Sequence, residues 1–349
     1  MEITTVGIDL AKNVFQIHGV DERGHAVLKK QLKRGQMMEF FVNLPPCLIG
    51  MEACGSAHHW ARELAKLGHN VKLMAPQFVK PYVKTNKNDM ADAEAICEAV
   101  ARPNMRFVPI KTVEQQALLS LHRVRQGLVK ARTAQSNQIR GLLGEFGLIV
   151  PKGISQIAPR IPDILEDADN GLPGLFRDLI SRLLTHFNDL HRQVLELETQ
   201  IKAWHRESPA SLKLAEIPGI GPITATAMVA SVGNARDFGN GRQLAAWLGL
   251  VPKQHSSGGK SVLLGISKRG DSYLRTLLIH GARSAILAAQ RRLDRGEGQA
   301  DGWLTGLLQR RNPNIAAVAL ANKNARIIWA LLTQDRQYQA NYVRAMKPT

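Results

Sequence analysis

The stretch VGIDLAK, residues 6–12, is a short apolar run that ends in a carboxylate, Asp9. LIGMEACG, residues 48–55, repeats this pattern with Glu52 after a second apolar run. Short apolar runs of this kind are typical of buried strands. We therefore expect both carboxylates at the ends of buried strands.

A third stretch, NKNDMADAEA at residues 86–95, carries Asp89 and Asp92 at the start of a helical segment. Residues three apart lie on one face of a helix, so these two carboxylates are expected side by side. Four gathered carboxylates repel one another unless divalent cations neutralise them. We therefore predict a Mg²⁺ site formed by Asp9, Glu52, Asp89 and Asp92, of the kind that cuts or joins phosphodiesters.

The segments between these carboxylates predict the fold of the first part of the chain. Three short β-type runs at 3–9, 14–20 and 26–32 are separated by turn-like stretches, which is typical of an antiparallel meander. The elements that follow are a helix near 36–43, a strand at 47–51, a helix at 56–67, a strand at 71–74 and a helix from about residue 89. The order βββαβαβα, with acids at the ends of the first and fourth strands and on the last helix, predicts a ribonuclease H-like α/β fold.

The charge of the chain indicates an acidic polymer as partner. The 349 residues include 46 Lys and Arg against 29 Asp and Glu, a formal net charge of +17. Basic residues exceed acidic ones by seven in residues 102–140 and again by seven in residues 251–312. Such segments favour nucleic acid. Since only 5% of the residues are aromatic, base stacking is not expected to dominate binding.

The sequence disfavours several other classes of protein. It contains no apolar run of about 18 residues and no signal pattern before the first strand, so neither a membrane span nor export is expected. The cysteines, Cys47, Cys54 and Cys97, form no CxxC pair, which disfavours structural zinc and a disulfide framework. We expect a protein of the reducing cytoplasm without a membrane partner.

Two helical patterns occupy the middle of the chain. Residues 112–146 form a long basic pattern, and apolar residues from Phe176 to Trp204 recur at three- and four-residue steps, close to a coiled-coil seam. A heptad pattern does not identify its partner, so the seam could join two helices of one chain or two subunits. The residues of the basic helix expected to contact phosphate are Arg123, Arg125, Lys130 and Arg132.

The last part of the chain begins near residue 209. IPGIGPITATAMVASVG, residues 217–233, predicts a helix-hairpin-helix in which Gly219 and Gly221 let the backbone approach a phosphate. A glycine turn between packed helices is the alternative. A Gly-, Ser- and Lys-rich loop at 255–275 follows, then helices at 271–289 and 315–333. Its neighbourhood supplies further candidate phosphate ligands, unless they form only a solvated basic face: Lys253, Lys260, Lys268, Arg269 and Arg275.

Taken together, these motifs closely resemble the insertion-sequence transposases with a RuvC-like DEDD domain and a C-terminal serine domain, the bridge-RNA-guided recombinases. The motifs GIDLAK, GMEACGS, KNDMADA, IPGIGPITA, AAWLGLVPKQHSSGGK and ISKRGD occur in the right order. The resemblance implies α/β plus α architecture in three parts: a RuvC-like metal domain (1–104), a basic helical hairpin or coiled coil (105–208) and a helical transposase domain with the serine (209–349).

The resemblance also implies a mechanism. The four acids would bind Mg²⁺ and take part in catalysis, and the nucleophile would be the serine before glycine after the GL-x-P turn, which is Ser257. Ser256 is adjacent, so the choice between them stays open. The family further implies cutting and rejoining of donor and target DNA through a covalent phosphoserine link, a noncoding guide RNA, and a homo-oligomer, a dimer that becomes a tetramer on nucleic acid.

Two other functions remain open from the residues alone. A Holliday-junction-type nuclease would use only the four acids, and a non-catalytic nucleic-acid-binding protein would use only the basic helices and the hairpin. A serine is a poor nucleophile at neutral pH without a base, a metal or a strong field. The neighbours His255, Lys253 and Lys260 have no spacing that identifies such a base.

Overall fold

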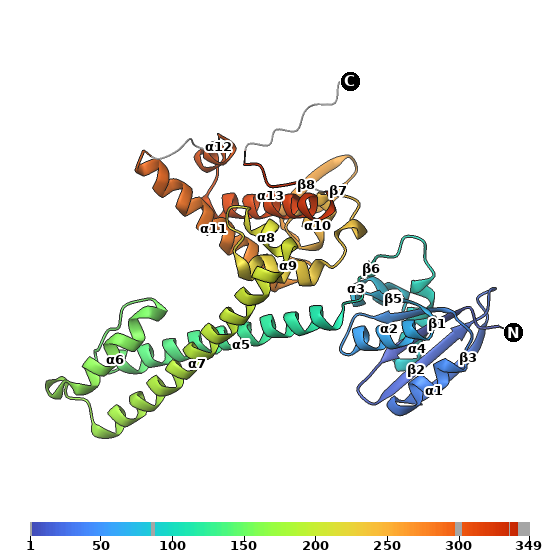
Figure 1. Ribbon diagram of the computed structural model, residues 1–349, viewed down its shortest axis with the longest axis horizontal. Coiled ribbons are helices and arrows are strands. Elements are labelled where there is room, and N and C mark those ends of the chain that lie inside the picture. Colours follow the sequence, from blue (N-terminus) through green and yellow to red (C-terminus); the bar gives the residue numbers. More distant parts are fainter. Residues whose placement is uncertain (1, 85–87, 297–301, 335, 341–349) are drawn as a thin grey trace. The chain divides into compact units, whose positions relative to one another are not determined.

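The computed structural model describes residues 2–84, 88–296, 302–334 and 336–340 (Figure 1). The chain forms two compact units, residues 1–113 and 114–349. Asn86 and Lys87, which open the stretch quoted for the paired aspartates, lie outside the described residues.

The first unit is a mixed β-sheet with helices on both faces. Its strands are β1 (Thr5–Leu10), β2 (Val14–Val20), β3 (Ala26–Lys33), β4 (Leu48–Glu52), β5 (Asn70–Met74) and β6 (Phe107–Val108), and its helices are α1 (Met37–Val42), α2 (Ala57–Lys66), α3 (Pro76–Val79) and α4 (Asp89–Val100). The strand order is 3-2-1-4-5-6. β1 pairs antiparallel with β2 and parallel with β4, and β4 and β5 are also parallel. The order of the other elements is the βββαβαβα pattern predicted for a ribonuclease H-like domain; the short helix α3 and the short strand β6 were not expected.

One face of the sheet packs on α1 and α2. Val6 and Ile8 of β1 and Ile49 and Met51 of β4 are buried there, in one cluster with Leu64 of α2. Successive residues of a strand point to opposite faces. The residues between these apolar side chains therefore face the other side of the sheet, where α4 contacts β1 and β4.

In its described residues the second unit has helices and one β-hairpin. Its helices are α5 (Val113–Gly144), α6 (Ile157–Glu166), α7 (Gly174–Glu207), α8 (Pro209–Ala215), α9 (Pro222–Val232), α10 (Gly241–Trp247), α11 (Ser272–Asp294), α12 (Gly302–Arg310) and α13 (Pro313–Thr333). Strands β7 (Pro252–Ser257) and β8 (Lys260–Ile266) form an antiparallel hairpin. The prediction of a helical second part is correct for most of this unit, but the segment interpreted as a Gly/Ser loop is a hairpin.

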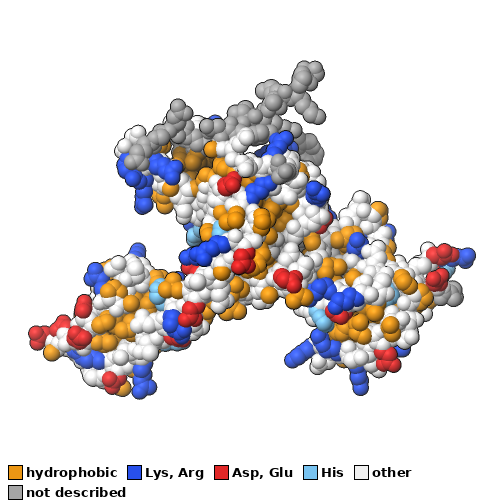
Figure 2. All heavy atoms as spheres, viewed as in Figure 1, with side chains coloured by type: hydrophobic (Ala, Val, Ile, Leu, Met, Phe, Trp, Pro, Cys, Tyr) orange, Lys and Arg blue, Asp and Glu red, His pale blue; other side chains and the backbone are white. Residues whose placement is uncertain are grey.

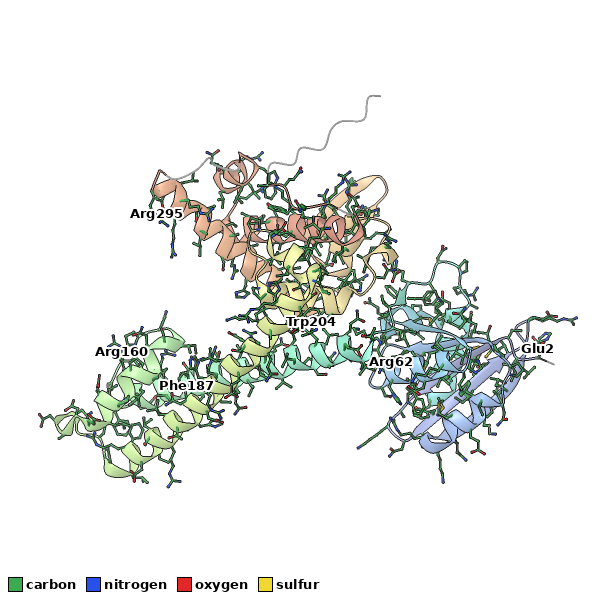
Figure 3. All side chains as sticks on the ribbon, in the orientation of Figure 1. Glu2, Arg62, Arg160, Phe187, Trp204 and Arg295 are labelled. Atoms are coloured by element: carbon green, nitrogen blue, oxygen red, sulfur yellow. The ribbon has the colours of Figure 1, made fainter. Side chains whose placement is uncertain are left out.

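The apolar seam of α7 faces another helix of the same chain. Phe187 (Figure 3) lies in one buried cluster with Ile139 of α5. Further along, Arg125 Nε of α5 donates a hydrogen bond to Glu198 Oε1 of α7 at 3.0 Å. At these positions α5 and α7 form an intramolecular helical hairpin, so the internal alternative holds there.

Helix α13 forms part of the core of the second unit. Ala317, Ala321 and Ile328 are fully buried, and Asn324 Nδ2 donates to the Pro218 carbonyl oxygen at 3.0 Å. Among the described helices, α13 is the one long and apolar enough to cross a membrane by length and composition. Its packing against α10 and α11 accounts for that apolar character.

Candidate active site

Glycines in β1 and β4 bring α4 close to the sheet. A Cβ on Gly7 would lie 2.2 Å from a backbone oxygen of α4, and one on Gly50 would lie 2.7 Å from a side-chain carbon of α4. Asp9 and Glu52 each follow one of these glycines by two residues, so they share its face of the sheet. Both acids therefore lie on the side where α4 packs.

The start of α4 fixes two further carboxylates. The side-chain oxygen of Asn88 accepts hydrogen bonds from the backbone nitrogens of Met90 and Ala91, at 2.8 and 2.9 Å, and so caps the helix. Asp89 and Asp92 lie in its first turn, where the helix dipole stabilises negative charge. The cap thus determines where both side chains leave the helix.

Three of the four predicted metal ligands converge. One carboxylate oxygen from each of Asp9, Asp89 and Asp92 lies within 4.8 Å of the others. Ligand oxygens on opposite sides of a bound Mg²⁺ or Ca²⁺ ion are separated by about 4 to 5 Å. The spacing and the hard oxygen donors of these side chains therefore fit a divalent cation.

Glu52 is outside this triplet but lies at the same level of the sheet. β1 and β4 are parallel and Ile8 pairs with Met51, so Asp9 and Glu52 come one residue later on neighbouring strands. Both carboxylates also lie close enough to Cys54 to affect its thiol. Burial is the largest cause that raises the pKa of this thiol, and the negative charges of Glu52 and Asp9 raise it further. Glu52 thus ends the strand next to that of Asp9, at the same edge of the sheet.

A hollow of about 390 Å³ is formed by the segments that follow β1, β3 and β4. It is lined by Leu10, Ala11, Lys12, Arg34, Cys54, Gly55 and Ser56. The Arg34 guanidinium lies 5.3 Å from the centroid of the Trp60 ring, and its Nη1 donates to the Lys12 carbonyl oxygen at 3.2 Å. Lys12 and Arg34 bring positive charge to the lining of this hollow. Neither residue was predicted from the sequence, although Lys12 belongs to the VGIDLAK stretch.

The candidate serines lie on the exposed β7–β8 hairpin. Ser256 and Ser257 end β7, and Gly258 and Gly259, with φ of +54° and +77°, connect it to β8. Positive φ at both turn positions is the requirement of a tight two-residue hairpin, and Gly-Gly is its sequence signal. Since adjacent strand residues point to opposite faces, the two hydroxyls point to different sides.

Neighbouring side chains distinguish the two serines. Ser256 Oγ accepts a hydrogen bond from Gln254 Nε2 at 2.8 Å. His255 shares the face of Ser257 because it lies two residues earlier, and Lys260 is the cross-strand partner of Ser257. Ser257 therefore has an imidazole and an ammonium group on its side of the hairpin.

The predicted phosphate-binding residues of the second unit fall into two groups. Arg125, Arg132 and Arg275 are half-buried and donate hydrogen bonds within the unit, to Glu198, His191 and the Leu248 carbonyl oxygen. The other predicted basic residues are exposed: Arg123, Lys130, Lys253, Lys260, Lys268 and Arg269. Figure 2 shows Lys and Arg side chains at several places on the surface. The exposed group is therefore the more accessible to a phosphate.

The two glycines of the IPGIGP turn have different surroundings. α8, the turn and α9 form a helix–turn–helix arrangement. Gly219, with φ of +87°, packs against the backbone of α11, whereas nothing lies within 4 Å of a Cβ on Gly221. Packing, the alternative considered from the sequence, accounts for Gly219, and Gly221 is the position open to a phosphate.

Comparisons with known proteins place these features in a family. The transposase domain of the DEDD IS110 type matches residues 6–147, and the Transposase IS116/IS110/IS902 family matches residues 211–296. The chain is 54% identical over 340 residues to the probable family 20 transposase of Pseudomonas aeruginosa, covering 97% of this chain and 99% of that protein. The chain belongs to the IS110/IS116/IS902 transposase family. The resemblance of its motifs to insertion-sequence transposases with a DEDD domain is therefore confirmed, whereas the serine domain and the bridge RNA stay predictions.

Two further relatives are similar over nearly their whole length. The transposase for insertion sequence element IS1328 of Yersinia enterocolitica is 44% identical over 332 residues, covering 95% of this chain and 97% of that protein. The transposase for insertion sequence element IS1111A of Coxiella burnetii is 45% identical over 338 residues, covering 97% and 92%. This transposase is thus a DNA-acting enzyme, and the DEDD domain match agrees with a divalent-metal site at the acidic cluster.

Proposed function

We propose that this transposase cuts and rejoins insertion-element and target DNA through a covalent phosphoserine intermediate, with Mg²⁺ at its DEDD site. The observation that carries the metal assignment is the convergence of Asp9, Asp89 and Asp92 oxygens within 4.8 Å, with Glu52 level on the next strand. Bound Mg²⁺ would polarise the scissile phosphate and neutralise its charge. Asp9, Asp89 and Asp92 would hold the cation together with Glu52.

Substrate positioning at this unit falls to Lys12 and Arg34. Both line the hollow formed by the segments that follow β1, β3 and β4. Because Arg34 is held by Trp60 and the Lys12 carbonyl, its guanidinium is pre-oriented toward a phosphate. These side chains keep the phosphodiester against the carboxylates, which would otherwise repel it.

The covalent step is assigned to Ser257. Its Oγ attacks phosphorus, a P–Oγ bond forms, and the bond from phosphorus to one deoxyribose oxygen breaks. His255 takes the serine proton and passes it to the departing deoxyribose oxygen, while Lys260 offsets the negative charge of the phosphoryl group. The phosphoserine ester conserves one P–O bond, so a hydroxyl of another strand can reverse the step and rejoin DNA.

Guidance and assembly complete the proposal. An element-encoded bridge RNA guides the enzyme to its targets. The protein is a dimer that becomes a tetramer on nucleic acid. In the tetramer, each composite active site is formed by residues of two subunits. The reaction takes place in the cytoplasm. Support comes from the motif resemblance and from exposed basic side chains such as Arg123, Lys268 and Arg269. Sequencing of RNA that co-purifies with the protein tests the guide directly.

The metal assignment and the serine assignment are tested together on donor DNA that carries the element ends. Asp9→Asn or Asp92→Asn should abolish strand cleavage with the fold retained, as should a chelator, and added Mg²⁺ should restore the chelated wild type. Glu39→Gln, an exposed acid on α1, is the matched control and should cleave normally. Full activity of Asp92→Asn, or in chelator, contradicts the metal site. Metal-dependent cleavage without any denaturation-resistant adduct selects a hydrolytic nuclease instead.

A further inference from the structure

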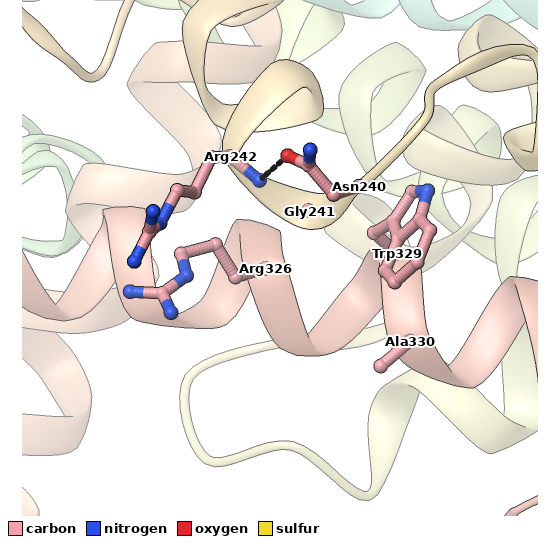
Figure 4. A pocket seen from close by; sticks show the side chains of 6 residues that line it. All are labelled: Asn240, Gly241, Arg242, Arg326, Trp329 and Ala330. Atoms are coloured by element: carbon pink, nitrogen blue, oxygen red, sulfur yellow. Dashed lines mark hydrogen bonds between the residues drawn. The ribbon is translucent and has the colours of Figure 1, made fainter. Parts of the chain in front are cut away.

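A hollow of about 350 Å³ lies in the second unit between two arginines and a tryptophan (Figure 4). It is lined by Asn240, Gly241, Arg242, Arg326, Trp329 and Ala330. These residues come from the start of α10, with its cap, and from α13. None of them has a role in the metal site or the serine hairpin.

Close packing of α10 on α13 holds the two arginines together. A Cβ on Gly241 would lie 2.9 Å from the Arg326 Cα, so the backbones of the two helices touch at this point. Arg242 is the next residue, so its backbone lies close to that of Arg326. Figure 4 shows both guanidinium groups extending toward the same side of the hollow.

The charge of this pair is not neutralised within the described part of the chain. Both arginines are exposed, and none of the ion pairs among the described residues includes either of them. Two neighbouring guanidinium groups repel each other unless an anion lies between them. Arginine forks match the oxygens of a phosphate in geometry as well as charge.

The opposite wall of the hollow is flat and rigid. Trp329 Nε1 donates to the carbonyl oxygens of Ala235 and Phe238 at 3.1 and 2.9 Å, which fixes the indole ring. Asn240 uses its side-chain oxygen to cap α10, accepting from Arg242 N at 3.0 Å, which leaves its amide nitrogen available as a donor. The hollow thus combines two cationic forks, an amide donor and an aromatic surface.

We propose that the Arg242–Arg326 hollow binds a phosphodiester of a nucleic-acid backbone, with the attached sugar or base against Trp329. This proposal rests on the proposed function, because the polymer that binds would be the DNA or the guide RNA of this transposase. It requires neither the metal site nor the serine. DNA and RNA share the phosphodiester, so the experiment has one arm for each.

The test measures binding of the full-length protein to a random-sequence DNA duplex and to a random single-stranded RNA, by fluorescence anisotropy across a salt series without divalent metal. Arg242→Gln with Arg326→Gln should lower affinity about 10-fold or more and reduce the salt slope by about one for each arginine that contacts phosphate. Arg242→Lys with Arg326→Lys keeps the charge but loses the forks and should give an intermediate affinity. Arg182→Gln, an exposed arginine on α7 outside both basic segments, is the matched control.

Each outcome decides the proposal. If only the affinity for the DNA duplex falls, the hollow binds DNA, and if only the affinity for the RNA falls, it binds RNA. If both affinities fall, the hollow binds the phosphodiester backbone that the two polymers share. Affinities and salt slopes equal to those of Arg182→Gln on both probes overturn it. If thermal unfolding shows the double variant to be unfolded, the single Arg326→Gln variant decides by the same comparison. Because no cleavage is measured, the result is independent of the metal and serine assignments.

Discussion

Gly219 and Gly281 lie backbone against backbone: a Cβ on Gly281 would be 1.9 Å from the Gly219 carbonyl oxygen, and one on Gly219 would be 2.4 Å from the Gly281 carbonyl oxygen. The contact joins the turn before α9 to the middle of α11. Any side chain at either position would separate these elements. The IPGIGP motif is therefore a packing motif at Gly219, whatever its second glycine binds.

Replacing Gly281 with Ala should destabilise the second unit, although Ala is the better helix former. Overpacking costs roughly 1–3 kcal/mol, whereas the gain in helix propensity is about 1 kcal/mol. Gly127→Ala in α5 is the control, because nothing lies within 4 Å of its Cβ position, and it should be as stable as wild type or more so. Urea unfolding measures both variants, and a Gly281→Ala protein as stable as the Gly127→Ala protein contradicts the packing argument.

A buried histidine predicts how stability depends on pH. His122 is 1% exposed, with Nδ1 3.0 Å from Tyr273 Oη and Nε2 3.0 Å from Thr226 Oγ1. Thr226 donates its own proton to the Pro222 carbonyl oxygen, so it accepts from His122 Nε2–H, and Nδ1 accepts from Tyr273. In this arrangement the neutral imidazole has a partner at both ring nitrogens.

Burial, followed by the charge of Arg125, lowers the pKa of His122 from 6.5 to about 4. Between these values the unfolded chain binds a proton that the folded protein does not, so stability is complete above the unfolded pKa and falls as pH decreases toward 4. The loss is on the order of 3 kcal/mol. His122→Gln should flatten this part of the profile, measured as the free energy of unfolding at pH 7 and pH 4.5. An unchanged difference between the two pH values in His122→Gln rejects this role.

The sequence predicted the acidic site because its signals are local. Asp9 and Glu52 end apolar runs, and Asn88 and Asp89 mark a helix start, so each carboxylate could be placed on its element without long-range information. The β7–β8 hairpin escaped because it is exposed on both faces, and a strand with no buried side lacks the apolar alternation that reveals strands. In the sequence of this segment, only the Gly-Gly turn indicates a hairpin.

Contacts between distant segments could not be predicted in this way. A charge count treats Arg123 and Arg125 alike, yet residues two apart on a helix point in different directions. Arg125 meets Glu198, 73 positions away, while Arg123 is exposed. Arg242 and Arg326 are likewise 84 positions apart by their numbers and meet only because α10 packs on α13.

The α5–α7 hairpin makes a prediction about the seam of α7. Leu190 is 6% exposed, so Leu190→Asp should lower the free energy of unfolding by about 2 kcal/mol or more, since it buries an unpaired charge. Leu195→Asp on the same helix, where Leu195 is 50% exposed, should change it by less than about 0.5 kcal/mol. Chemical denaturation and light scattering check both. A stable, folded Leu190→Asp protein of lower mass would show that the seam joins subunits.

Exposed and internal basic residues of α5 should respond differently to substitution. Arg123→Glu with Lys130→Glu should weaken nucleic-acid binding for many sequences alike and flatten its salt dependence, with unfolding unchanged, because both side chains are exposed. Arg125→Ala should instead reduce stability, since it leaves the half-buried Glu198 without its partner. Filter binding across a salt series and thermal unfolding measure the two effects. Affinity independent of salt in the wild type refutes the electrostatic account.

The last prediction concerns the nucleophile. A serine transposase must pass through an ester between one side chain and a DNA phosphate, whereas a hydrolytic nuclease releases products free of protein. Ser257→Ala should remove both the covalent adduct and recombination while nucleic-acid binding persists, because one hydroxyl adds little to an interface dominated by phosphate contacts. Ser256→Ala should cause only a partial defect, since Ser256 is engaged by Gln254 on the other face of β7. Mass spectrometry of a trapped, nuclease-trimmed adduct should place the nucleotide on Ser257. A nucleotide on Ser256, or cleavage without an adduct, overturns the assignment.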